Sequence, residues 1–450
     1  MHIHFIAIGG SAMHNLAIAL HAKGHRITGS DDKLRDPSKS RLQHHGILPP
    51  AEGWYPGRIT PDIDLIILGM HARIDNPELA KARELGIPVM SYPEYLYEHS
   101  KDKTRIVIAG SHGKTTITAM VLHAFRQMHI ETDYMVGAQL EGFDTMVSLS
   151  ENAPYIVLEG DEYLSSPIDP RSKFLHYRPH ILLISGIAWD HINVFPTYDE
   201  YLNTFRQLVS GLPAHAKLIY NAEDPEVVRL VRYAGSLVER IPYSTPPYEI
   251  RNGTTYLTGE TEVPLQIFGK HNYSNMQGAA GICRATGMDE RDFFDSMRSF
   301  KGASRRLEIV ARSKRGVLIR DFAHAPSKVR ASLKAVAEQF AGMRIIAVLE
   351  LHTFSSLNKD YIRRYQGSLD EADTAAVYYD PAAVKHKDME VISPGAIKKA
   401  FGRDDLTVLT SATELEEFIN TFPPANQAVL MMSSGGFGGL DWNKLAALYG

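Results

Sequence analysis

Apolar runs of strand length alternate with segments of helical periodicity along the chain. Near the N-terminus, residues 2–8 and 63–68 have the pattern of buried strands, and residues 12–23 and 77–85 have the pattern of helices that end at glycine. Such alternation is typical of a parallel sheet covered by helices. It predicts an α/β fold that begins with a Rossmann-like unit.

Two further blocks repeat this alternation. The predicted strands lie at residues 155–158, 180–184 and 217–220 in the second block, and at 316–320, 344–349, 374–379, 406–409 and 428–432 in the third. Between them, residues 238–268 contain short alternating runs punctuated by Pro, Thr and Gly, which predicts an antiparallel flank. We therefore expect three domains: an N-terminal Rossmann-like domain (1–103), a central α/β domain (104–303), and a C-terminal Rossmann-like domain (304–450).

Composition narrows the class of protein. The 450 residues are 44% hydrophobic and 22% charged with a net charge of −4, so no bulk charge favours nucleic acid or an anionic membrane. Cys283 is the single cysteine, which excludes an intramolecular disulfide. The first residues lack the pattern of a signal peptide, and no apolar run reaches the ~20 residues of a membrane span. We expect a cytoplasmic protein; the sequence says nothing of its oligomeric state.

A glycine-containing loop follows a predicted strand and precedes a predicted helix. Its lysine would reach the β- and γ-phosphates of a nucleotide, and the following threonine would offer a hydroxyl to Mg²⁺. Ile108 stands where the general pattern has glycine, so the loop is shortened. The alternative is a surface turn that matches by chance. The expected nucleotide-binding residues are Gly110, Ser111, His112, Gly113, Lys114, Thr115 and Thr116.

Carboxylates and a histidine follow later predicted strands. Glu159 ends one strand, and with the Thr115 hydroxyl it would supply hard oxygen ligands for Mg²⁺. Asp161 and Glu162 fit either this site or a solvated acidic loop. In a later Asp-His pair, His191 would bind a second metal ion.

The N-terminal loop resembles part of a dinucleotide fingerprint. Gly9 and Gly10 follow the first strand, and Ser30 and Asp31 come about twenty residues later. Because a complete fingerprint is absent, the sequence favours binding of the diphosphate of some nucleotide over binding of NAD specifically. The alternative is a tight turn with Ser30 and Asp31 as caps.

Polar residues also cluster near the boundary of the third domain. Asn272 and Asn275 could pair with an adenine edge, or Asn272 or Ser274 could cap a helix over 276–285. Arg305 and Arg306 offer guanidinium groups to phosphate. Asp321 and His324 follow another predicted strand, and the glycine-rich loop 431–439 either approaches a ligand or forms a flexible turn.

Taken in order, seven of these motifs resemble the signature set of the muramyl (Mur) peptide ligases over essentially the whole chain. The resemblance implies a UDP-sugar-binding first domain (1–103), a central P-loop domain that binds ATP (104–303) and a C-terminal domain for the incoming amine or peptide (304–450). It also implies cofactors ATP and Mg²⁺, and an acyl phosphate that an amine captures as an amide, with release of ADP and phosphate. The implied catalytic residues are Lys114, Glu159, His191, Arg305 and His324. The implied adenosine contacts are Asn272, Asn275 and Asp321, with Arg305 or Arg306 on phosphate. The implied UDP-binding residues are Gly9, Gly10, Ser30 and Asp31.

Within the family, residues 169–177 and 431–439 look most like the members that join UDP-N-acetylmuramate to the murein tripeptide L-alanyl-γ-D-glutamyl-meso-diaminopimelate in peptidoglycan recycling, a process of cell-wall biogenesis that supports cell shape and division. The near neighbours add L-alanine instead. The chain departs from the family pattern at Ala7, Gly160, Asn193, Ala325 and residues 351–355, which affects fine substrate contacts.

Three alternatives belong to other classes or substrates. A nicotinamide-dependent oxidoreductase with an ATP module would also use the N-terminal fingerprint. An ATP-gated sensor would bind nucleotide without substrate-dependent ADP release. Folylpolyglutamate synthetases share the ATP core but lack the first domain expected at 1–103.

Overall fold

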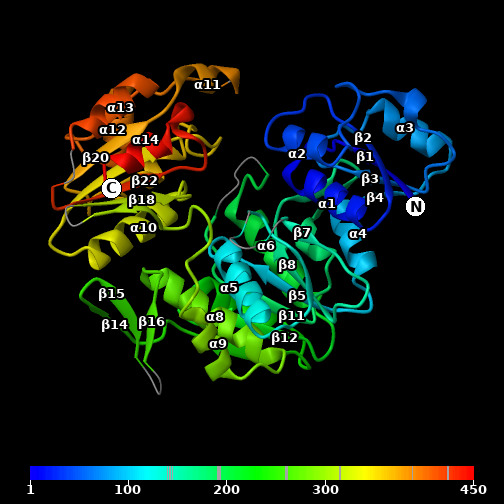
Figure 1. The fold of residues 1–450 in the computed structure, drawn as a ribbon, viewed down its shortest axis with the longest axis horizontal. Helices are drawn as coiled ribbons and strands as arrows, with labels where there is room; N and C mark the ends of the chain where they lie inside the picture. The colour runs from blue at the N-terminus through cyan, green and yellow to red at the C-terminus, as the bar shows by residue number, and fades with distance from the viewer. Residues whose placement is uncertain are drawn as a thin grey trace. The chain divides into compact units, whose positions relative to one another are not determined.

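The chain forms two compact units (Figure 1). The computed structural model describes residues 1–138, 140, 143, 145–189, 194–258, 262–313, 316–387, 389–422 and 425–449. The first unit comprises Met1–Ile187, Asp199–Ser244 and Gly278–Phe293, and the second comprises Ala188–Tyr198, Thr245–Gln277 and Phe294–Gly450. Among the described residues, none of the helices has the length and apolar character to cross a membrane.

The N-terminal part of the first unit is a four-stranded parallel sheet, as predicted. Its order is β2-β1-β3-β4, from β1 (His2–Ile6), β2 (Arg26–Ser30), β3 (Leu65–Leu68) and β4 (Val89–Ser91). The accompanying helices are α1 (Ser11–Ala22), α2 (Ser38–His44), α3 (Pro77–Glu84) and α4 (Tyr92–His99). Asn76 caps α3, and Ser91 forms a reciprocal capping box with Glu94 at the start of α4.

The central sheet of the first unit has seven strands in the order β13-β12-β11-β5-β8-β6-β7, and only the edge pair β6–β7 is antiparallel. The strands are β5 (Thr104–Ala109), β6 (Thr132–Met135), β7 (Val147–Ser148), β8 (Tyr155–Gly160), β11 (Ile181–Ile184), β12 (Lys217–Asn221) and β13 (Glu239–Tyr243). The helices in this region are α5 (Lys114–Gln127), α6 (Tyr198–Ser210), α7 (Pro225–Leu230), α8 (Lys270–Ala285) and α9 (Glu290–Met297). Strands β5 and β8 lie side by side, so the polar segments after them meet at one edge.

A short hairpin of β9 (Leu164–Ser166) and β10 (Asp169–Ser172), followed by the 3₁₀ turn η2 (Lys173–Leu175), attaches to α4. Arg171 donates to both oxygens of Asp169 and lies 3.8 Å from the Glu94 carboxylate. The His176 ring lies 3.3 Å from the same aspartate. This segment is the one that resembles the tripeptide-adding members, and it ties the N-terminal sheet to the central one.

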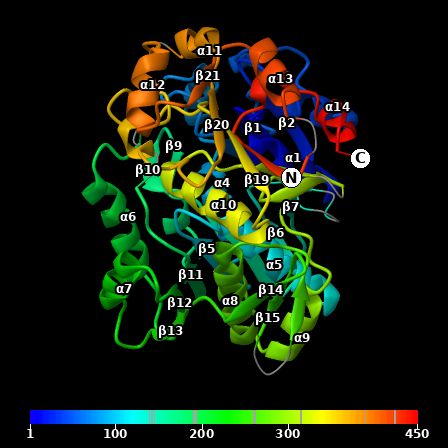
Figure 2. The same cartoon turned by 90° about the vertical axis from the view of Figure 1, so that its left-hand side faces the viewer.

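The predicted antiparallel flank is smaller than expected. Residues 239–243 form β13, which pairs in parallel with β12, so this part of the prediction is wrong. The antiparallel sheet holds β14 (Tyr248–Arg251), β15 (Thr254–Leu257) and β16 (Val263–Leu265) in the second unit (Figure 2). Thr255 and Tyr248 bond to Gln339 and Glu338 of α10, which fixes the flank to the C-terminal sheet.

The C-terminal sheet has the order β17-β18-β22-β19-β20-β21, parallel except for β17. Its strands are β17 (Glu308–Arg312), β18 (Gly316–Asp321), β19 (Arg344–Glu350), β20 (Thr374–Tyr378), β21 (Thr407–Leu409) and β22 (Gln427–Met432). Its helices are α10 (Pro326–Gln339), α11 (Pro381–His386), α12 (Pro394–Phe401), α13 (Ala412–Asn420) and α14 (Trp442–Ala447).

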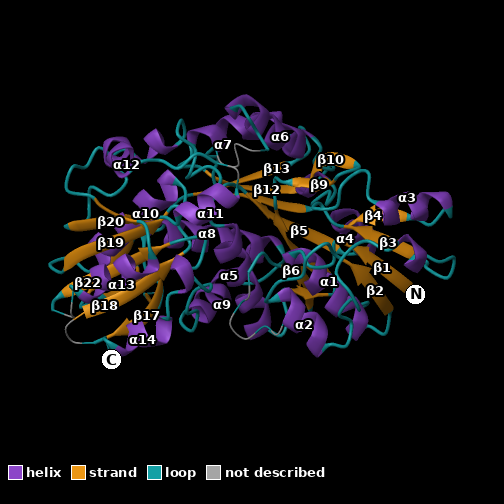
Figure 3. Ribbon diagram, turned by 90° about the horizontal axis from the view of Figure 1, so that it is seen from above, coloured by secondary structure: helices purple, strands orange, loops and turns teal. Residues whose placement is uncertain are grey.

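Alternate residues of the C-terminal strands enter two separate hydrophobic cores. Ile319 and Leu430 pack into the core that includes α10 and α12, whereas Leu318 and Val429 pack into the core that includes α13 and α14. Helices therefore cover both faces (Figure 3), which confirms the predicted doubly wound class. The exact domain bounds at 103/104 and 303/304 stay a prediction.

Helix α8 begins at Lys270, six residues before the predicted start. Asn272 and Ser274 therefore lie inside the helix, and the prediction that either one caps it is wrong. The polar residues are tolerated there because the side chain of Asn272 donates to the Phe268 carbonyl and the Tyr273 hydroxyl accepts from the Gly269 N–H.

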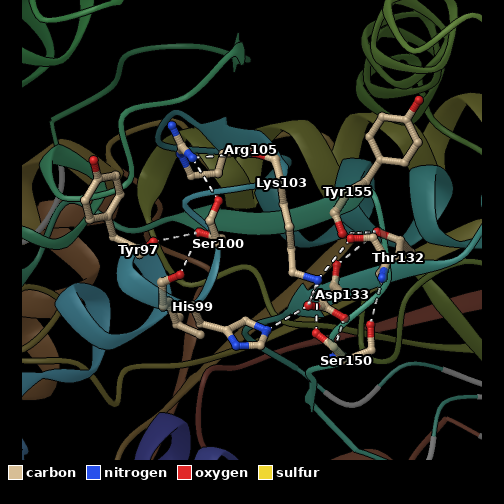
Figure 4. A network of polar contacts seen from close by, with 11 residues as sticks. Tyr97, His99, Ser100, Lys103, Arg105, Thr132, Asp133, Ser150 and Tyr155 are labelled. Carbon is tan, nitrogen blue, oxygen red and sulfur yellow. Dashed lines mark hydrogen bonds and ion pairs between the residues drawn. The ribbon is translucent and has the colours of Figure 1, made fainter.

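A buried ion network joins α4 and the following segment to β6 (Figure 4). The Asp133 carboxylate, with a fully buried side chain, accepts from His99 at 2.9 Å and Ser150 N at 2.7 Å, and lies 3.0 Å from Lys103 Nζ. Lys103 also donates to the carbonyls of Ser150 and Ala153. Burial alone would raise the pKa of Asp133, but these donors hold the pKa below its usual value.

We predict that Asp133→Asn lowers the free energy of unfolding by about 3 kcal/mol at neutral pH, because Lys103 loses its buried partner. Since the folded pKa is depressed, the contribution is fully present above about pH 4 and is lost as pH falls further. Urea unfolding between pH 3 and 8 measures both effects. The exposed Asp102→Asn is the control, and equal stability of the two variants at pH 7 would contradict the role of the network.

Candidate functional site

The glycine-containing loop lies between β5 and α5, as the sequence predicts. Gly110 has φ of 120°, and a Cβ there would lie 3.0 Å from both the Ser185 nitrogen and the Gly186 carbonyl. Gly113 has φ of 78° and occupies the N-cap of α5. Both positions favour glycine, and the loop presents the N-terminus of a fourteen-residue helix, which attracts anions.

Lys114 lies across this loop and forms a buried ion pair. Its ammonium donates to the Gly110 carbonyl at 2.6 Å and to Glu162 Oε2 at 3.0 Å. The Glu162 side chain is only 1% exposed. Burial would lower the pKa of Lys114, but Glu162, Asp161 and Glu159 together hold the pKa above its usual value. The ammonium is therefore charged throughout the physiological range.

Glu159 and Thr115 come together beside Lys114. The Thr115 hydroxyl donates to Glu159 Oε2 at 3.2 Å, and the Gly137 N–H donates to Oε1 at 2.9 Å. A Cβ on Gly137 would lie 2.8 Å from the carboxylate, so a larger residue there would displace the Glu159 side chain from this position. The two predicted oxygen ligands of Mg²⁺ thus lie within one hydrogen bond of each other.

The two remaining acidic residues of this segment differ. The Asp161 carboxylate is partly exposed and forms an ion pair with Lys173, whose Nζ lies 2.5 Å from Asp161 Oδ2. Glu162 is buried, so the interpretation of a solvated acidic loop is wrong for this residue. No sequence pattern identified Glu162 as the partner of Lys114, because the two residues are 48 positions apart.

Hydroxyl groups from other elements complete the loop. Ser111 shares a 2.7 Å hydrogen bond with the Tyr201 hydroxyl, which also donates to Glu162. The Ser185 hydroxyl donates to the carbonyl of His112. Thr116 is buried in the first turn of α5. Sequence analysis missed Tyr201 and Ser185, since a lone tyrosine in a helix and a serine after a strand carry no distinctive spacing.

His191, the predicted ligand of a second metal ion, lies outside the described residues, as do Asp190 and Asn193. Its role stays a prediction.

The N-terminal loop is held by side chains from its own sheet. The Gly9 N–H donates to Asp31 Oδ2 at 2.7 Å, and the Ser30 hydroxyl donates to the fully buried Glu78. Burial raises the pKa of Asp31 to about 6. Gly10 is the N-cap of α1. Ser30 and Asp31 are thus positioned to shape the loop, whereas Gly10 and the first turn of α1 offer backbone groups to an anion.

In the second unit, Asp321 ends β18 and organises the preceding turn. Its carboxylate accepts the Leu307 N–H at 3.1 Å and the Ser332 hydroxyl. His271 of α8 is close enough to interact electrostatically with this carboxylate. Burial lowers the pKa of His271, and the negative charge of Asp321 opposes this shift only in part. The predicted Asp321 thus meets the start of α8, the helix that carries Asn272 and Asn275.

The two arginines near the boundary and His324 surround Phe322. Arg305 has φ of 57° and accepts the Phe322 N–H at its carbonyl, at 2.8 Å. The Arg306 guanidinium lies 4.4 Å from the centre of the Phe322 ring. His324 Nδ1 lies 2.8 Å from the Phe322 carbonyl, and the hydroxyl of Tyr365 donates to the His324 carbonyl.

Asn272 and Asn275 are both buried on α8. The amide of Asn272 already donates one N–H to the Phe268 carbonyl, which leaves its oxygen and its second N–H for a base edge. Five predicted residues of the second unit thus lie at or near the start of α8 and the end of β18: Asn272, Asn275, Arg305, Arg306 and Asp321. The residues of the glycine-containing loop belong to the first unit.

Family comparisons cover nearly the whole chain. A model described as "Mur ligase family, catalytic domain" matches residues 2–104, one described as "Mur ligase middle domain" matches 108–283, and one described as "Mur ligase, glutamate ligase domain" matches 305–435.

Individual relatives match end to end. A UDP-N-acetylmuramate–L-alanine ligase of Clostridium acetobutylicum is 30% identical over 93% of this chain and 91% of its own. The UDP-N-acetylmuramate–L-alanyl-γ-D-glutamyl-meso-2,6-diaminoheptandioate ligase of Escherichia coli is 29% identical over 100% of this chain and 98% of its own. A solved murein peptide ligase of Psychrobacter arcticus shares the fold, with a TM-score of 0.67 and 24% sequence identity. The match covers 100% of this chain and 98% of that one.

Substitutions in the Lys114–Glu162 pair can separate its contribution to stability from its contribution to ATP turnover. We predict that Lys114→Ala lowers the free energy of unfolding by about 3 kcal/mol, since the buried Glu162 carboxylate loses its cationic partner, and reduces ADP release by more than about a hundredfold. Adding Glu162→Gln should restore most of the stability and none of the turnover. Denaturant unfolding and coupled ADP assays measure the two effects. Near-normal ADP release by either variant would refute the role of Lys114.

Proposed function

The chain belongs to the Mur ligase family, and on that premise we propose that it joins the carboxylate of UDP-N-acetylmuramate to the amino group of L-alanyl-γ-D-glutamyl-meso-diaminopimelate. Members of the family are ATP-dependent ligases that form amide bonds, so this chain is an enzyme of that class. The oxidoreductase and sensor alternatives are set aside. The observation that carries the choice of substrate is the end-to-end match to the tripeptide ligase of Escherichia coli.

The phosphate loop would bind the triphosphate. Backbone N–H groups at Gly110 to Gly113 and the start of α5 would contact its oxygens, and Lys114 would exchange the Gly110 carbonyl for the β- and γ-phosphates. Asn272, Asn275 and Asp321 would contribute to adenosine binding, and Arg305 or Arg306 would contact phosphate.

The donors around Glu159 fit Mg²⁺. The Thr115 hydroxyl and the Glu159 carboxylate are hard oxygen ligands that lie 3.2 Å apart, which suits an ion that keeps several waters. When bound, Mg²⁺ would neutralise charge on the transferring phosphoryl group. His191 is the proposed ligand of a second ion.

The reaction requires a carboxylate to become a good acylating group. A carboxylate oxygen of the sugar attacks the γ-phosphorus, the bond to ADP breaks, and an acyl phosphate forms. The amine then attacks the acyl carbon, phosphate leaves with the bridging oxygen, and the amine loses a proton. Lys114 stabilises the charge that develops on the phosphoryl oxygens, and His324 is proposed to lie near the transferred group.

The sugar nucleotide is proposed to bind at the N-terminal loop. Gly10 and the first turn of α1 would face the UDP diphosphate, while Asp31 fixes the Gly9 backbone and Ser30 anchors the loop to Glu78. A cytoplasmic location remains part of the proposal, since the sugar nucleotide and ATP must meet in one compartment.

Addition of L-alanine is the second candidate, because a relative with that name reaches 30% identity. We predict that the wild-type enzyme releases ADP with UDP-N-acetylmuramate plus the tripeptide, and much more slowly with L-alanine. A coupled assay and mass spectrometry of the product decide between them. Product formation with L-alanine alone would overturn the tripeptide assignment and leave the family intact.

A further inference from the structure

The C-terminal unit contains a cavity of about 700 Å³. Lys359, Arg363 and Gln366 line it from the segment after β19, and Glu390 and Ile392 from the segment after β20. Figure 2 shows α12, which supplies Lys399, near β21 and β20. Both lining segments follow strands of the C-terminal sheet, and ligands of open α/β sheets bind beyond the carboxyl ends of the strands.

The lining combines open positive charge with an apolar floor. Arg363 and Lys399 are exposed, and neither forms an ion pair with any residue that the structure describes. Lys359 pairs with Glu390 at 2.5 Å, so the cavity also offers one carboxylate. Ile362, Ile392 and Ala400 form its buried base. Such a surface suits an elongated ligand with several carboxylates and one ammonium group.

One wall of the cavity is linked to the loop that carries His324. The 3₁₀ turn η4 (Ile362–Tyr365) supplies Arg363, and the hydroxyl of Tyr365 in the same turn donates to the His324 carbonyl. The Arg330 guanidinium on α10 reaches the carbonyls of residues 364 and 366 at 3.4 Å. These contacts fix the position of the cavity wall relative to the end of β18, where His324 and Asp321 lie.

We propose that this cavity binds the distal γ-D-glutamyl-meso-diaminopimelate part of the peptide substrate, an inference that rests on the proposed function. Arg363 and Lys399 bind its carboxylates, and Glu390 binds the ammonium group of its diaminopimelate. L-alanine has a single carboxylate next to its reacting amine and cannot fill a space of this size, so the cavity gives the enzyme its preference for the peptide.

The test compares Arg363→Ala, Lys399→Ala and the double variant with wild type, and Lys334→Ala on α10 serves as a charge-matched exposed control. We expect each single variant to raise KM for the tripeptide about tenfold, the loss of one charged hydrogen bond. The double variant should raise KM further, while kcat and KM for ATP and for L-alanine stay unchanged. Arg363→Lys should recover part of the affinity, and Lys334→Ala should match wild type.

Two results would overturn the inference, and they are distinguishable. A double variant with wild-type KM for the tripeptide refutes the cavity while the proposed function stands. A wild-type enzyme that forms product with L-alanine alone refutes the proposed function itself, before any variant is made. Thermal melting shows whether the variants are folded. If an alanine variant is not folded, the double variant Arg363→Gln with Lys399→Gln takes its place.

Discussion

The ion pair between Lys114 and the buried Glu162 is the interaction on which the proposed catalytic site depends. A positive charge beneath a phosphate loop must be kept ionised and aimed, and the nearly unexposed Glu162 does both. The pair exists because β5 and β8 are adjacent parallel strands, so the loop after one meets the carboxylates after the other. The same adjacency brings Glu159 to Thr115. Sheet order therefore determines the chemistry available at this edge.

The second unit uses the same constraint. Asp321 and Glu350 are the last residues of β18 and β19, and Ser433 follows β22, which lies between these two strands. The segments after β19 and β20 form the cavity lined by Arg363 and Lys399. Parallel sheets in each unit thus present polar groups at their carboxyl edges. In the proposed function, nucleotide, sugar acid and amine would each bind a separate set of these residues.

The sequence predicted those features that depend on local spacing. The α/β class, the loop at Gly110 to Lys114 and the pairing of Thr115 with Glu159 follow from strand, glycine and carboxylate patterns. Features that depend on long-range contact were missed: Glu162 as the partner of Lys114, and the parallel pairing of residues 239–243. The early start of α8 was missed because polar residues in a first helical turn resemble a loop.

In the proposed reaction, ATP activates the sugar carboxylate as an acyl phosphate at the Lys114 site. The most direct test supplies UDP-N-acetylmuramate labelled with ¹⁸O in its carboxylate, together with ATP and the tripeptide, and measures the phosphate by mass spectrometry. The account predicts that one labelled oxygen appears in the phosphate for each amide bond formed. Amide formation with unlabelled phosphate would contradict it.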